Sequence, residues 1–173
     1  RLGIEGGISI LGTSGIVVPM SESALLESIR IEMKMLAENG GRYLVMTPGN
    51  YGEAFSKNEL GLDMTFSMKC SNYVGETLQR ADNLDVKGIL FIAHIGKFIK
   101  VSGGIMNTHS HHADCRAELL AAAAARAGAD ITCVRELLDT ITTEEGLDVL
   151  IRHHMLEPAM KTVLERAEYY LAH

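Results

Sequence analysis

The segment Ile89-Leu90-Phe91-Ile92-Ala93-His94-Ile95-Gly96-Lys97, continued by Gly103-Gly104 and Asn107-Thr108-His109-Ser110, joins an apolar run to a set of polar side chains. The apolar run predicts a buried strand that ends in polar residues. In an open parallel α/β sheet the ligand crevice lies beyond the carboxyl ends of the strands. We therefore expect His94, Lys97, Asn107 and His109 to lie at such a crevice.

Composition favours one domain in a reducing compartment. The 173 residues suffice for a single α/β domain, 1–173, with a substantial core. The formal net charge of -6 argues against binding to nucleic acid or to anionic lipid. No apolar run approaches the roughly 18 residues of a membrane span. Cys70, Cys115 and Cys133 are odd in number and widely spaced, which indicates free thiols and a cytoplasmic protein.

The sequence begins without Met and opens directly on a glycine-rich approach to a strand, Gly6 to Leu11. We therefore expect a fragment of a longer protein.

Strands and helices are expected to alternate along the chain. The patterns predict strands at 6–11, 42–46, 64–69 and 89–93. Helices are expected from the cap Ser21 to the stop at Gly40, at 74–81 with Ser71 or Asn72 as cap, at 95–101, at 113–127 and twice in the tail. This order predicts a three-layer, mostly parallel, Rossmann-like sheet with helices on both faces and extra C-terminal helices.

Four polar loops should meet at the carboxyl edge of this sheet: 12–15, 47–52, 71–72 and 94–110. Glycines let a backbone approach a ligand closely, and N–H groups at helix starts bind carboxylates or phosphates. Each glycine and proline could equally serve only to make a turn. Neither the phosphate-binding pattern GxxxxGK[ST] nor the dinucleotide pattern GxGxxG occurs, so a nucleotide kinase and an ordinary Rossmann cofactor site are disfavoured.

A metal-dependent hydrolase using His94, His109, His111 and Asp114 is one alternative, because imidazoles and carboxylates bind zinc or iron. The spacing does not fit the HxHxDH pattern, and we expect His111 and His112 on an exposed first helical turn. Lys97, Lys100 and Arg116 would supply a positive patch for a polycarboxylate if they lie near the crevice. A non-catalytic binding domain for a small ligand is the other alternative.

Five motifs, in this order, resemble the cobalt-precorrin-5B (C1)-methyltransferase family, CbiD, of anaerobic cobalamin biosynthesis. They are Gly7-Ile8-Ser9-Ile10-Leu11-Gly12-Thr13-Ser14-Gly15-Ile16-Val17, Thr47-Pro48-Gly49-Asn50-Tyr51-Gly52, Ser71-Asn72-Tyr73-Val74-Gly75-Glu76, His94-Ile95-Gly96-Lys97 and Asn107-Thr108-His109-Ser110. The resemblance implies methyl transfer from S-adenosylmethionine to carbon C-1 of a contracted tetrapyrrole whose cobalt belongs to the substrate. It also implies a further N-terminal domain as a partner. Whether the protein forms a homo-oligomer is left open.

The resemblance leads to a set of site assignments. Cofactor-binding residues are Gly12, Thr13, Gly15, Thr47, Gly49, Asn50 and Gly52, whose backbone N–H groups would bind the methionine carboxylate. Residues facing the tetrapyrrole and its carboxylate arms are Asn72, Lys97, Asn107 and His109. His94 is the catalytic candidate, because a histidine ordinarily titrates near neutral pH and can move a proton. No metal-binding residue is assigned. The resemblance implies residues other than histidine at positions 111 and 112, so it gives this pair no shared metal role.

Overall fold

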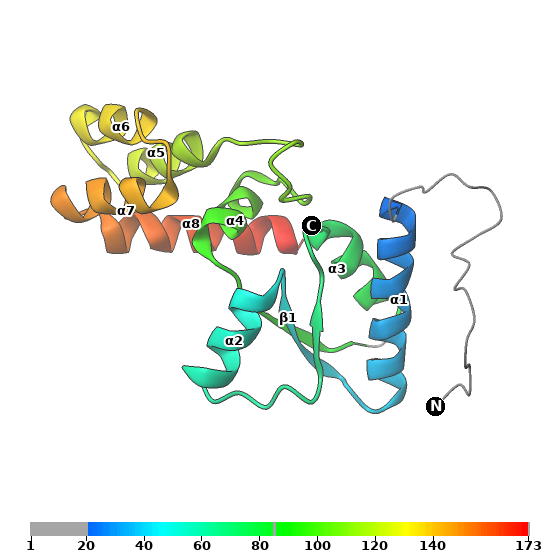
Figure 1. Ribbon diagram of the computed structural model, residues 1–173. Coiled ribbons are helices and arrows are strands. Elements are labelled where there is room, and N and C mark those ends of the chain that lie inside the picture. Colours follow the sequence, from blue (N-terminus) through cyan, green and yellow to red (C-terminus); the bar gives the residue numbers. More distant parts are fainter. Residues whose placement is uncertain (1–20, 85, 173) are drawn as a thin grey trace, which may run out of the picture.

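The computed structural model describes residues 21–84 and 86–172, and within them a three-stranded parallel sheet (Figure 1). The strands are β1 (Tyr43–Thr47), β2 (Ser67–Lys69) and β3 (Gly88–Phe91), in the spatial order β2-β1-β3. In the register, Val45 lies opposite Ser67 on one side and Leu90 on the other. The predicted α/β fold is confirmed. The expected strand 6–11 and the candidates Gly12, Thr13 and Gly15 lie outside the described residues.

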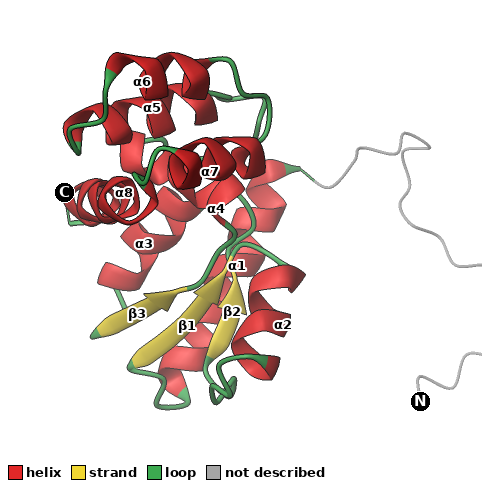
Figure 2. Cartoon of the chain, turned by 90° about the vertical axis from the view of Figure 1, so that its left-hand side faces the viewer, coloured by secondary structure: helices red, strands yellow, loops and turns green. Residues whose placement is uncertain are grey.

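Helices cover both faces of the sheet. Helices α1 (Glu22–Glu38) and α3 (Val74–Asp82) lie on one face, and α2 (Asn50–Asn58) lies on the other (Figures 1 and 2). Ser21 caps α1 as predicted, since its hydroxyl accepts a hydrogen bond from the Ala24 N–H at 3.2 Å. Buried residues of α1 and the strands form one core: Ile29, Met33, Leu44, Met46, Met68, Cys70 and Ala81.

A helical part follows the sheet and lies beyond the carboxyl ends of its strands (Figure 2). It contains α4 (Ile95–Phe98), the 3₁₀ helix η1 (Ile99–Gly103), α5 (Arg116–Arg126), α6 (Ile131–Leu138), α7 (Thr143–Arg152) and α8 (Leu156–Leu171). Leu120, Leu137 and Leu150 are fully buried in its core. Val74, Val101 and Ala167 form a smaller cluster that joins this core to the sheet. Among the described helices, none has the length and apolar character needed to span a membrane.

Two helices were not predicted from the sequence. Residues 47–52 were expected to be a loop, but α2 begins at Asn50 and uses Gly49 as its cap residue. Asn and Gly are poor helix formers, so packing against the sheet outweighs local propensity here. Helix α6 was missed although Asp130 marks its start, because the Asp130 carboxylate accepts the Cys133 N–H at 2.8 Å.

Several element boundaries also differ from prediction. The strand expected at 89–93 ends at Phe91 and is only half buried, because β3 has one neighbour among the described strands and Leu90 is 50% exposed. Strand β2 is shorter than 64–69. Tyr73, rather than Ser71 or Asn72, is the cap residue of α3, since Ser71 has a left-handed backbone with φ of 54°. Helix α5 starts at Arg116, three residues after the expected start.

Candidate functional site

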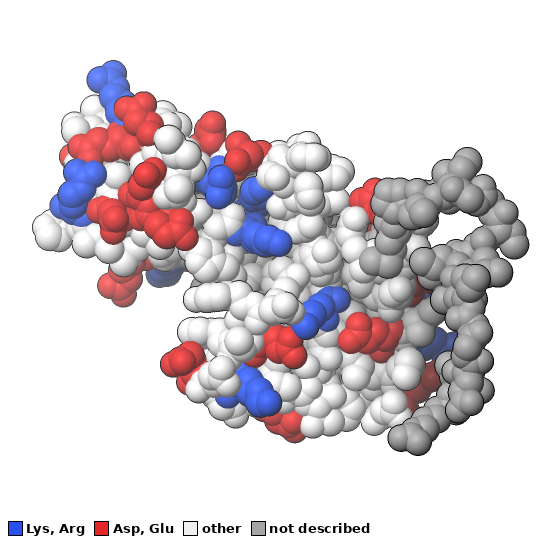
Figure 3. All heavy atoms as spheres, in the orientation of Figure 1, with Lys and Arg blue, Asp and Glu red and all other residues white. Residues whose placement is uncertain are grey.

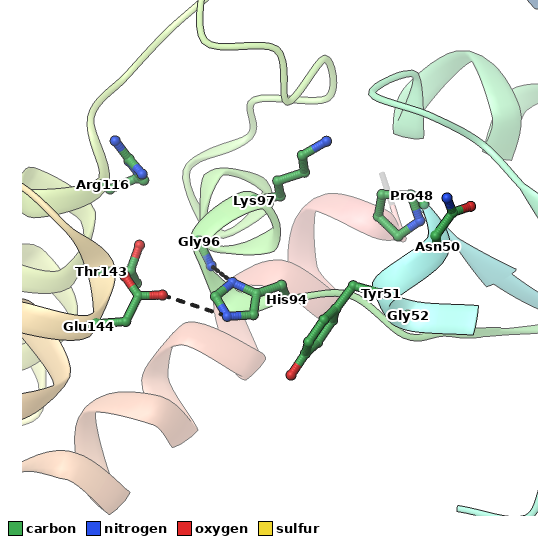
Figure 4. Close-up of a pocket in the computed structure, with 11 residues that line it drawn as sticks. Pro48, Asn50, Tyr51, Gly52, His94, Gly96, Lys97, Arg116, Thr143 and Glu144 are labelled. Carbon is green, nitrogen blue, oxygen red and sulfur yellow. Dashed lines mark hydrogen bonds and ion pairs between the residues drawn. The ribbon is translucent and has the colours of Figure 1, made fainter. Parts of the chain in front are cut away.

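A cavity of about 440 Å³ lies where the carboxyl ends of β1 and β3 face the helical part (Figure 4). Its walls come from three places in the sequence. The segment after β1 contributes 48–52, the segment after β3 contributes His94, Gly96 and Lys97, and the starts of α5 and α7 contribute Arg116, Thr143 and Glu144. The volume lies in the range of small-molecule sites, roughly 300–1,000 Å³.

The N-terminus of α2 forms one wall. Gly49 is the cap residue and has no side chain, so no side chain caps the first turn of this helix. Uncapped first-turn N–H groups, together with the helix dipole, favour an anionic ligand group. Gly52 brings the helix close to β3, since a Cβ at this position would lie 2.6 Å from the Ile92 carbonyl oxygen. The Lys69 ammonium donates to Asn50 Oδ1 at 2.8 Å and holds this turn in place.

His94 lies in the middle of the cavity wall and contacts both parts of the protein. Its Nδ1 accepts the Gly96 N–H at 3.2 Å, so a neutral His94 ring would have its proton on Nε2. Nε2 lies 3.6 Å from Oε1 of Glu144 on α7. The Tyr51 ring meets the imidazole edge-on at a centroid distance of 5.3 Å. His94 is therefore oriented by groups from α2, α4 and α7.

Two cations line the same cavity. The Lys97 ammonium donates to Asn72 Oδ1 at 3.1 Å. Arg116 donates through two nitrogens to the Asp114 carboxylate, at 2.7 and 3.0 Å, and this hydrogen bonding lowers the pKa of Asp114. Figure 3 shows basic side chains gathered where the helical part meets the sheet part. This edge can hold acidic groups although the chain as a whole is acidic.

Lys100, the third candidate for a positive patch, does not belong to this surface. It is only 4% exposed, and its ammonium donates to the carbonyl oxygens of Thr108 at 3.3 Å and Ala113 at 2.8 Å. Its role is to hold the ends of the loop 108–113. His111 and His112 are exposed as expected, but they lie in a turn before α5 rather than on its first turn.

Asn107 and His109 lie in a loop tied to the end of β2. The Thr108 N–H donates to the Asn72 carbonyl oxygen at 2.9 Å, and Asn107 pairs with Tyr73 in an isolated antiparallel bridge. Asn107 Oδ1 accepts the His109 N–H at 3.1 Å. These contacts bring the loop close to Asn72, but its side chains are not part of the cavity lining.

The structure brings several of the predicted site residues together. Gly49, Asn50, Gly52, His94 and Lys97 all line one cavity. Thr47 is 1% exposed and does not line it.

Thr143 and Glu144 line the cavity and were not predicted from the sequence. The capping box Thr142-x-x-Glu145 could have located the start of α7. Nothing in the sequence, however, places that start against the strand ends.

The hydrolase alternative gains no support from the geometry. Within 21–84 and 86–172, no three His, Cys, Asp or Glu side chains are grouped so that they could hold a metal ion. The rings of His109 and His111 are 4.8 Å apart by their centroids, but the His109 Nδ1 accepts the His111 N–H instead of facing a shared centre.

The fold and the cavity define an α/β protein with a polar cavity of small-molecule size at the carboxyl edge of a parallel sheet. Comparison with known proteins adds a family: residues 107–173 match the model of the CbiD C-terminal domain. The resemblance to CbiD inferred from the five motifs is confirmed. No solved structure shows a significant match.

Curated relatives extend the similarity to nearly the whole chain. The chain is 48% identical over 172 residues to the cobalt-precorrin-5B C(1)-methyltransferase of Ruminiclostridium cellulolyticum, covering 99% of this chain and 44% of that protein. The protein of the same name from Photorhabdus laumondii is 43% identical over 166 residues, covering 96% of this chain and 44% of its own length. The chain thus spans less than half the length of these relatives.

Proposed function

We propose that this chain forms part of an enzyme that transfers a methyl group from S-adenosylmethionine to carbon C-1 of cobalt-precorrin-5B in cobalamin biosynthesis. The names of the relatives support the reaction. The observation that supports it most within this chain is the shared cavity of Gly49, Asn50, Gly52, His94 and Lys97, all drawn from the motifs of the family. The three cysteines are free thiols, in keeping with a cytoplasmic enzyme.

The residues around the cavity fit the methyl donor. The uncapped N-terminus of α2 suits a carboxylate such as that of methionine, and we assign Gly49, Asn50 and Gly52 to this role. Thr47, which is buried, would support the turn that carries them. The buried Thr143 hydroxyl has no hydrogen-bond partner, which is the kind of group a ligand completes. The predicted contribution of Gly12, Thr13 and Gly15 stays a prediction.

The sulfonium donor supplies a methyl group that is already electrophilic, so the chain needs no covalent nucleophile. Its task is to align the donor and the acceptor carbon and to exclude water. Replacing a proton on the substrate by a methyl group requires a group that moves the proton. His94, oriented by Gly96 and Glu144, is our candidate for that role.

Lys97, Asn72, Asn107 and His109 are our candidates for binding the tetrapyrrole. Lys97 and Asn72 are hydrogen-bonded to each other, and the loop of Asn107 and His109 is anchored to the Asn72 backbone. A substrate with several carboxylate arms would meet an ammonium, amides and an imidazole along this edge. The cobalt enters as part of this substrate.

The direct test is incubation of the complete protein with cobalt-precorrin-5B and S-adenosylmethionine carrying a ¹³C-methyl group. The proposal expects one ¹³C-methyl resonance, attached to C-1 of the product, and stoichiometric S-adenosylhomocysteine. A product labelled at another carbon, or no transfer to this substrate, would contradict it.

A further inference from the structure

The cavity has a second polar wall, formed by the first two residues of α7, Thr143 and Glu144. Figure 4 shows them on the far side of His94 from Asn50 and Gly52. Glu144 also orients His94.

Thr143 has a hydroxyl that the fold does not use. The residue is 1% exposed, and its Oγ1 has no hydrogen-bond partner. Helix α7 does not need this group as a cap, because Thr142 and Glu145 already form a complete capping box. A buried hydroxyl without a partner destabilises a protein, so its presence at a cavity wall points to a ligand.

Gly96 packs closely against this hydroxyl. A Cβ on Gly96 would lie 3.2 Å from Thr143 Oγ1 and 3.2 Å from His94 Nδ1. The residue next to Thr143, Glu144, is the acidic side chain of the cavity lining and keeps 65% of its side chain exposed. The α7 wall therefore presents a hydroxyl and a carboxylate next to Gly96 and His94.

The carboxylate determines which ligand group fits this wall. Glu144 would repel a second carboxylate, whereas it can accept hydrogen bonds from hydroxyl groups. Thr143 can donate to or accept from the same group. Two adjacent hydroxyls match this pair, and the α2 N-terminus on the opposite wall is left for an anion.

We propose that Thr143 and Glu144 bind the 2′- and 3′-hydroxyls of the ribose of the methyl donor. This inference rests on the proposed function and extends it, because it assigns the nucleoside to the α7 wall and the methionine carboxylate to the α2 wall. The two walls together would bind a ligand that contains both a nucleoside and an amino acid more tightly than a nucleoside or an amino acid alone.

The test measures S-adenosylhomocysteine binding to the complete protein by titration calorimetry, without any need for turnover. Thr143→Val keeps the shape of the side chain and Glu144→Gln keeps its size. Each should weaken binding about tenfold. The matched control is Thr108→Val, which removes the other buried hydroxyl without a partner among the described residues but lies outside the cavity lining. It should bind the ligand like the wild type.

Deoxy analogues of the ligand distinguish a loss of ribose recognition from a general loss of folded structure in the variants. The wild type should bind the 2′-deoxy or the 3′-deoxy analogue of S-adenosylhomocysteine about tenfold more weakly than the parent compound. The Thr143→Val, Glu144→Gln double variant should bind parent and analogues alike.

If the wild type binds S-adenosylhomocysteine and both single variants bind it with the same affinity, the ribose assignment is overturned and the proposed function still stands. No binding of S-adenosylhomocysteine to the wild type would overturn both. Thermal unfolding of each variant shows whether the fold is kept, and Glu144→Gln, at an exposed position, tests the wall even if Thr143→Val is unstable.

Discussion

His94 contacts a different partner through each ring nitrogen, and these two contacts set what it can do. Nδ1 accepts from the Gly96 N–H, while Nε2 faces the Glu144 carboxylate. The side chain is 44% exposed and borders the cavity, so a bound substrate can reach it. In the proposed reaction, His94 would move a proton and would not hold the methyl donor.

Replacing His94 by Ala should therefore separate catalysis from binding. We expect methyl transfer by the complete protein to fall by about 100-fold, the lower end of general acid-base effects. Binding of S-adenosylhomocysteine should change by less than about threefold. His153→Ala is the control, because His153 makes a similar contact to Glu136, with Nε2 to Oε1 at 3.2 Å, outside the cavity. Unchanged turnover in His94→Ala would remove His94 from the mechanism.

Cys70 follows β2 directly and is completely buried. Burial raises the pKa of its thiol to about 12, because the thiolate loses its hydration. Since the thiolate is the reactive form, we expect no alkylation of Cys70 by iodoacetamide at pH 8 in the folded protein. Cys115, which is partly exposed, should react first. Mass spectrometry of the labelled peptides checks this, and rapid labelling of Cys70 in the folded state would contradict it.

Single residues at the strand ends could be predicted because their position follows from chain order. Gly49, Asn50, His94 and Lys97 come directly after predicted strands, and parallel strands end at one edge. Thr143 and Glu144 lie about 50 residues further along, and only the packing of α7 against α4 brings them to the cavity. Local patterns hold no information about such a long-range contact.

Helix α2 shows how tertiary packing can override local propensity. Its first residues, Asn50 to Gly52, are turn residues, and the segment 47–52 was therefore expected to be a loop. The helix forms because Gly52 and Ser56 are buried against the sheet. The strands and α1, in contrast, could be predicted because their apolar spacing agrees with the fold.

Gly52 should therefore be essential for the stability of α2, while a substitution at Gly49 should change the stability little. A Cβ at Gly52 would meet the Ile92 carbonyl oxygen at 2.6 Å and Thr47 Cβ at 3.0 Å. We expect Gly52→Ala to lower the free energy of unfolding by about 2 kcal/mol, as overpacking does. At Gly49 a Cβ would meet nothing within 4 Å, so Gly49→Ala should change stability by less than about 0.5 kcal/mol. Urea unfolding measures both, and equal stabilities would refute this view of α2.

The molecule as a whole consists of a sheet part and a helical part, each with its own core, joined by the small cluster of Val74, Val101 and Ala167. The cavity lies at their junction and takes residues from both. The α/β class could be predicted from alternating strands and helices. The way in which α7 closes one side of the cavity could not, because it depends on how two separately packed parts meet.

Backbone amide chemical shifts during titration of the complete protein with S-adenosylhomocysteine test most directly whether this cavity holds the methyl donor. We predict large shifts for Gly49, Gly52 and Gly96, which line the cavity, and none for Gly40 and Gly128, which do not. Shifts confined to another surface, such as the groove of about 560 Å³ beside α3 that includes Gly75 and Gly88, would contradict the assignment.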